Sequence, residues 1–246
     1  MRVLLWVIRL AIFWVLPFTG IAQRTIQLPV NSSIGLQTQL AYEMALQPRW
    51  QAGTEFTAKT WGLTQQGFYA DAKLYAAFLL SPTATLRAGF TRVQVHTVQN
   101  KQWFAGQPEE ENRFWLQGLL AAPVGKLWIN NRYTAEARWL DNEFLNYRFR
   151  YQISTQINLQ NRYTTPEPWK LALSNEVFFM PSTRVPFERN LVQIGLVKPM
   201  QKLQIGGFWV FEQFFHEQHP YQKSFLQIQL LVRPFQRNAL VAMPIH

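Results

Sequence analysis

The sequence predicts an all-β fold, namely a single antiparallel transmembrane β-barrel that follows an N-terminal signal peptide. Three observations predict it: the chain opens with a short apolar run and a cleavage pattern, apolar and polar residues alternate along the rest, and no later stretch is a candidate transmembrane helix. Because backbone polar groups cannot stay unpaired in lipid, only helices and closed barrels span a membrane. The alternation therefore favours the barrel.

The N-terminus has the three parts of a signal peptide. Arg2 supplies the positive charge, residues 10–18 form the apolar run, and Gly20-Ile21-Ala22 places small residues before a cleavage point at Gln23. The run is shorter than the roughly 20 residues of a spanning helix, which favours cleavage over a membrane anchor. We predict a signal peptide over residues 1–22 and an outer-membrane barrel domain over residues 23–246.

Strands are predicted from the two-residue period of apolar side chains. In residues 32–42, Leu36 and Leu40 share one face, and Gln37 and Gln39 share the other. The same alternation predicts ten further strands, at about 50–58, 67–80, 84–96, 113–120, 126–139, 144–153, 169–180, 189–198, 202–214 and 222–233.

The strand count follows from a general rule, because single-chain bacterial barrels normally have an even number of strands. With residues 24–29 as a further short strand, the prediction is twelve strands, with ten as the alternative. Around Gly89 the apolar side chains change face, which predicts a β-bulge there. Short links such as 81–83 suit the periplasmic side of a Gram-negative cell outer membrane, and longer links such as 97–112 suit the outside.

Lipid is expected to cover the apolar face, which holds Leu127, Ile129, Ala137, Leu145 and Phe149. A soluble β-sandwich or ligand-carrying barrel alternates in the same way with its apolar face turned inward. The pattern alone leaves this alternative open. The signal peptide, the 15% aromatic content and the absence of cysteine favour the membrane barrel.

Four segments carry a family resemblance. They are Asn112-Arg113-Phe114-Trp115, residues 131–139 (Asn-Arg-Tyr-Thr-Ala-Glu-Ala-Arg-Trp), residues 147–151 (Tyr-Arg-Phe-Arg-Tyr) and Asn175-Glu176-Val177-Phe178. In this order the chain resembles the uncharacterised outer-membrane β-barrels catalogued as domain of unknown function 2490. The resemblance covers most of residues 23–246 and implies an outer-membrane barrel without implying a substrate. Residues 187–190 depart from the family pattern, since Arg189 precedes Asn190 where the family has Asn before Arg.

The polar face of the middle strands holds the candidate site, a lumen network of charged side chains. Its predicted members are Arg113, Arg132, Glu136, Arg138, Arg148, Arg150, Glu176 and Arg189. Arginine presents a forked set of donors that suits carboxylates and phosphates. Charges inside a barrel must be paired, so one interpretation is a ladder of ion pairs that fills the lumen. The other is a positively biased passage or pocket, because arginines outnumber glutamates.

Three functional hypotheses follow. The first is a small channel or binding barrel for an anionic solute, and the second is a structural or interaction barrel with a plugged lumen. The third is a lipid-modifying outer-membrane enzyme, for which the sequence offers no G-x-S-x-G nucleophile motif and assigns no catalytic residue. Outer-membrane lipid and the assembly machinery of that membrane are the expected partners.

Other chemistries find little support in the sequence. The segment His216-Glu217-Gln218-His219 is too sparse to predict a metal site, and we expect neither a metal nor a cofactor. The formal net charge of +10 comes from basic residues spread over many strands rather than clustered, which argues against a nucleic-acid partner.

Overall fold

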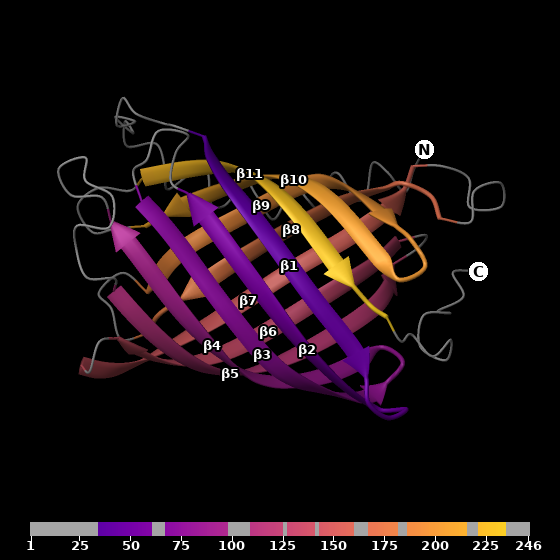
Figure 1. Ribbon diagram of the computed structural model, residues 1–246, viewed down its shortest axis with the longest axis horizontal. Coiled ribbons are helices and arrows are strands. Elements are labelled where there is room, and N and C mark those ends of the chain that lie inside the picture. Colours follow the sequence, from indigo (N-terminus) through magenta and orange to yellow (C-terminus); the bar gives the residue numbers. More distant parts are fainter. Residues whose placement is uncertain are drawn as a thin grey trace.

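A computed structural model describes residues 34–60, 67–97, 109–124, 127–140, 143–159, 167–181, 186–215 and 221–234. These residues form a closed barrel of eleven tilted strands (Figure 1). The strands are β1 (Gly35–Ala45), β2 (Trp50–Thr60), β3 (Gly67–Ser81), β4 (Ala84–Thr97), β5 (Glu109–Val124), β6 (Leu127–Leu140), β7 (Glu143–Asn158), β8 (Lys170–Phe179), β9 (Phe187–Pro199), β10 (Leu203–Phe214) and β11 (Tyr221–Val232).

Every strand pairs with its neighbours in sequence, and the ring closes where β1 meets β11. All the sequential pairs are antiparallel, whereas β1 and β11 are parallel, with Gln37 opposite Gln227 and Leu40 opposite Leu230. In Figure 1 the indigo β1 and the yellow β11 lie side by side. The parallel seam is a geometric consequence of the count, because the first and last strands of an odd meander run in the same direction.

Each of the eleven predicted segments overlaps a strand, but β5 and β7 extend beyond the predicted 113–120 and 144–153. The predicted number of twelve strands, or ten, is not confirmed, because the described residues close with eleven. Twelve strands, or ten, would make every pair antiparallel; eleven close the ring here because the seam accepts parallel pairing. Residues 24–29, expected to supply the twelfth strand, lie outside the described residues, as does the predicted signal peptide. No helix in the described part of the chain is long and apolar enough to cross a membrane.

The barrel is polar inside and apolar outside. Large apolar side chains are exposed along the outer wall, for example Leu74 (66%), Tyr147 (53%) and Phe149 (49%). The buried side chains include Arg148, Glu136, Glu176 and Glu212. This arrangement is the reverse of a water-soluble barrel and is typical of transmembrane barrels.

The bulge predicted near Gly89 is wrong. Strands β3 and β4 stay in register through Tyr75 and Gly89, and the shift in this pair lies between Leu79 and Ser81. The apparent change of face has another cause. Beyond Phe90 the outward positions of β4 are taken by Arg92 and Gln94, while Val93 is buried inside. Arg92 pairs with Glu110 of β5, so this end of the outer wall is polar.

Candidate functional site: the lumen network

Each predicted network residue has its side chain on the inner side of the wall. Arg113 comes from β5, Arg132, Glu136 and Arg138 from β6, Arg148 and Arg150 from β7, Glu176 from β8, and Arg189 from β9. The two-residue period of neighbouring antiparallel strands brings these side chains onto one face. In register, Glu136 is opposite Arg148, and Gln152, two residues after Arg150 on the same face of β7, is opposite Glu176.

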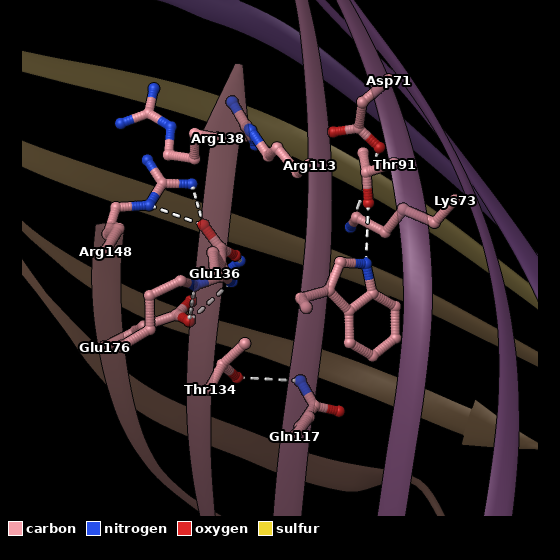
Figure 2. A network of polar contacts seen from close by, with 12 residues as sticks. Asp71, Lys73, Thr91, Arg113, Gln117, Thr134, Glu136, Arg138, Arg148 and Glu176 are labelled. Atoms are coloured by element: carbon pink, nitrogen blue, oxygen red, sulfur yellow. Dashed lines mark hydrogen bonds and ion pairs between the residues drawn. The ribbon is translucent and has the colours of Figure 1, made fainter. Parts of the chain in front are cut away.

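Two glutamates alternate with three arginines in the centre of the network. Arg148 binds Glu136 through Nη2–Oε2 at 2.5 Å, and Arg150 binds the other oxygen of Glu136 through Nη1 at 2.6 Å. Arg150 also binds Glu176 through Nη2 at 2.7 Å, and Arg132 reaches Glu176 at 3.1 Å. Figure 2 shows Arg148 and Glu136 projecting toward one another from neighbouring strands. Each carboxylate is therefore shared by two guanidinium groups.

A second carboxylate centre, Glu111, was not among the predicted residues. It accepts two hydrogen bonds from Arg113, Nε–Oε1 at 2.8 Å and Nη2–Oε2 at 2.7 Å. Arg138 of β6 binds the same carboxylate, with Nη2–Oε2 at 3.1 Å. Glu111 lies two positions before Arg113, on the same face of β5, so strand parity was the signal that would have found it.

Glu188 joins the network because of a β-bulge. The register of β8 and β9 shifts so that Phe178 is opposite Arg189 but Phe179 is opposite Phe187. The extra residue, Glu188, contacts Nη1 of Arg148 at 3.3 Å. Alternation along β9 puts Glu188 on the opposite face from Arg189, so sequence parity could not assign it to the lumen.

The aromatic ring of Phe178 contacts three arginines of the network. Phe178 is 2% exposed and faces the lumen. The guanidinium carbon of Arg189 lies 4.0 Å from its ring centroid, and those of Arg150 and Arg148 lie at 4.9 and 5.3 Å. Such cation–π contacts favour a desolvated guanidinium group. Phe178 therefore adds a cation–π contact to the ion pairs of three arginines.

The ion pairs extend across the lumen to strands that are not neighbours. Lys59 of β2 binds Glu212 of β10 at 2.7 Å, and Arg189 approaches the same carboxylate at 3.7 Å. Nearer the C-terminal end of β1, Glu43 accepts hydrogen bonds from Tyr75 at 2.7 Å and from Arg87 of β4 at 3.1 Å. Side chains therefore bridge the interior at more than one level.

Glutamine side chains form hydrogen bonds with one another inside the barrel, next to the seam between β1 and β11. Gln227 of β11 donates to Gln39 of β1 at 2.8 Å and accepts from Gln193 of β9 at 3.1 Å. Gln193 also accepts a hydrogen bond from Ser174 at 2.9 Å. These bonds satisfy buried polar groups without adding charge.

The charges of the network do not fully cancel. On strands β5 to β9 the network contains six arginines (Arg113, Arg132, Arg138, Arg148, Arg150 and Arg189) and four glutamates (Glu111, Glu136, Glu176 and Glu188). In the described part of the chain, the buried Nε atoms of Arg132 and Arg189 have no hydrogen-bond partner. Two guanidinium Nε–H groups of the network therefore have no acceptor among the described residues.

The candidates for a metal site add little to the site described above. Among the described residues, no group of three or more His, Cys, Asp or Glu side chains is placed to hold a metal ion. The segment 216–219 lies outside the described residues. The network is thus the chemically distinctive part of the described interior.

Comparison with known protein families identifies a match for most of the chain. A family model described as "Protein of unknown function (DUF2490)" matches residues 34–222, which is most of the chain and runs from the start of the barrel into β11. The chain belongs to the DUF2490 family. All eight predicted network residues of this DUF2490 barrel lie within the matched range.

A solved structure is also similar to the DUF2490 barrel. It is LpxR from Salmonella typhimurium, with 8% sequence identity and a TM-score of 0.47, and the match covers 74% of this chain and 83% of that chain. No curated protein matches the chain by sequence.

Proposed function

We propose that this chain is an outer-membrane barrel whose lumen is occluded by ion pairs and which acts as a structural or interaction barrel through its wall and loops. Residues 1–22 would direct export and then be cleaved, and the apolar outer wall would face lipid. The observation that carries the proposal is the chain of contacts Arg148–Glu136–Arg150–Glu176–Arg132, in which charged side chains from three neighbouring strands pair with one another inside the barrel.

The physical reason is the cost of leaving such charges alone. Removing one partner of a buried ion pair costs about 3–5 kcal/mol, because the other charge stays buried and uncompensated. A permeating ion would have to separate pairs of this kind at several levels, including Lys59–Glu212 and the Glu43 centre. The ion pairs therefore favour occlusion over conduction.

Planar-bilayer conductance tests the proposal. Residues 23–246 are refolded, and insertion is first checked by the change of electrophoretic mobility on heating. The expected result is an inserted barrel with no steady conductance. Steady openings of the unmodified protein would overturn occlusion while leaving the membrane placement intact, and failure to insert would overturn the membrane placement itself.

A second function, binding or passage of an anionic solute, is favoured by one specific observation. Six arginines face four glutamates on β5 to β9, and buried Nε donors of Arg132 and Arg189 are unused among the described residues. Under a salt gradient this function predicts openings that prefer anions, and neutralising Arg132 and Arg189 should weaken that preference.

A further inference from the structure

The outer wall contains a groove across β4 to β8 with a volume of about 400 Å³. Leu116, Tyr133 and Phe149 line it, and they are 52%, 50% and 49% exposed, so the groove opens outward. Thr134 and Arg150 also border it, but their side chains point into the lumen, where Thr134 binds Gln117 and Arg150 binds Glu136. The groove is thus separate from the lumen network.

Small residues make the floor of this groove. A Cβ atom built on Gly118 would meet no atom within 4 Å, so the surface is open there. Gly118 is opposite Leu86 on one side and Tyr133 on the other. Ala135, one strand further, is opposite Leu116 and Phe149. Each small residue is therefore flanked by two large ones, which produces a depression in an otherwise raised apolar wall.

The length of the groove follows from its strands. Neighbouring strands are about 4.8 Å apart, so the five strands β4 to β8 span roughly 19 Å. One leaflet of a bilayer contributes about half of a hydrocarbon core of roughly 30 Å. An extended hydrocarbon chain in one leaflet is therefore comparable in length with the groove.

The polar groups at the edge are neutral. Tyr151 stacks beside Tyr133, with 5.1 Å between ring centroids, and donates a hydrogen bond from its hydroxyl to Oδ1 of Asn131 at 2.8 Å. Among the described lining residues, no charged side chain faces the groove. Strongly anionic lipids are recognised by clusters of Lys and Arg. Because its edge is neutral, the groove offers no partner for a strongly anionic headgroup. This favours the acyl chain of an ordinary phospholipid as its occupant.

We propose that this groove, lined by Leu86, Leu116, Gly118, Tyr133, Ala135 and Phe149, is a binding site for one phospholipid acyl chain. The inference rests on the proposed membrane placement but not on whether the lumen conducts. It gives the outer wall a specific lipid contact in addition to general solvation by the bilayer.

Two glycines provide a matched test. Gly118 lies in the groove, whereas Gly207 of β10 also faces outward and also has no atom within 4 Å of a built Cβ, but lies outside it. Wild type, Gly118→Leu and Gly207→Leu are refolded in phosphatidylcholine–phosphatidylethanolamine vesicles and extracted in mild detergent. Bound phospholipid is then counted by native mass spectrometry, and heat-dependent mobility reports folding.

The expected result is one retained phospholipid in wild type and in Gly207→Leu, and at least a five-fold lower retention in Gly118→Leu. Equal retention in the two variants would overturn the site. If Gly118→Leu does not fold, Ala135→Leu blocks the same floor and carries the same expectation. Failure of wild type to insert into the vesicles would instead reject the membrane placement.

Two further outcomes would assign the groove to another occupant. Protein extracted from native outer membrane that retains lipopolysaccharide at this groove, and no phospholipid, would overturn the phospholipid assignment. A wild-type dimer that Gly118→Leu dissociates and Gly207→Leu does not would show that a second copy of the chain fills the groove.

Discussion

Lys59 of β2 and Glu212 of β10 form a buried ion pair, 2.7 Å from Nζ to Oε1, on the inside of the seam where β1 and β11 pair in parallel. The ammonium group also lies 3.8 Å from the ring centroid of Phe225 on β11. The four strands β2, β1, β11 and β10 are consecutive in the ring, so this contact spans the closure. It ties β2 to β10 across the seam, where a parallel ladder, slightly less stable per residue than an antiparallel one, closes the barrel.

Removing one partner of this pair should weaken the closure. We expect Glu212→Gln to lower the free energy of unfolding by about 3–5 kcal/mol, because the Lys59 charge stays buried without its main partner. Urea unfolding in lipid vesicles, followed by tryptophan fluorescence, measures the change. The double variant Lys59→Met/Glu212→Gln should recover part of the loss, and a double variant no more stable than the single one would argue against direct pairing.

The exposed pair Arg92–Glu110 is the control for that experiment. Its side chains are 48% and 36% exposed, on the outer face of β4 and β5. Exposed ion pairs contribute about 0–1 kcal/mol, so Arg92→Gln should change the unfolding midpoint little. A loss as large as that of Glu212→Gln would indicate that burial does not govern these pairs.

The central network predicts a graded effect of its two shared carboxylates. Glu136 contacts Arg148, which is 2% exposed, whereas Glu176 contacts Arg132, which is 29% exposed in its side chain. Both Glu136→Gln and Glu176→Gln should lower the unfolding midpoint, and Glu136→Gln should do so more, because water compensates the exposed partner of Glu176. If the two variants unfold at the same midpoint, or Glu176→Gln at the lower one, the difference in exposure between Arg148 and Arg132 does not govern the loss of stability.

A charge placed on an outward-facing side chain should cost more free energy the deeper that side chain lies in the bilayer. Leu145 is two residues from the start of β7, and Phe149 lies four residues further along the same face. Arginine on the lipid face costs about 2–4 kcal/mol at the bilayer midplane and about 0–1 near the interfaces. We expect Phe149→Arg to impair insertion into vesicles more than Leu145→Arg. Normal insertion and heat resistance of both variants would show that this face does not meet lipid.

Gly89 has a packing role in the inner wall. A Cβ atom built there would lie 2.5 Å from the carbonyl oxygen of Leu74 and 2.5 Å from Cζ2 of Trp115. Trp115 donates its indole hydrogen to Thr91 at 2.9 Å, which holds the ring over the glycine. Gly89→Ala should lower the free energy of unfolding by about 1–3 kcal/mol through overpacking.

Gly207→Ala provides the comparison, because its Cβ would enter open space. The same urea titration should show almost no loss of stability for this outward variant. If both alanine variants unfold at the wild-type midpoint, the close approach of Trp115 to Gly89 is relieved at no cost, and the packing argument fails.

The sequence alone determined the local features of this protein. Period-two alternation located all eleven described strands and placed Leu145 and Arg148 on opposite faces, because the direction of a strand side chain depends only on its parity within the strand. It also identified arginines such as Arg132 and Arg150 as members of one polar face. These properties need no knowledge of which strands meet.

Only the tertiary structure decided the rest. The parallel β1–β11 seam, the Lys59–Glu212 contact across it and the sharing of Glu136 by Arg148 and Arg150 depend on how the ring closes and on its stagger. The bulge that brings Glu188 beside Arg148 reverses the parity on which the sequence argument relied. Closure and register join residues far apart in the chain, and a local two-residue period contains no information about either.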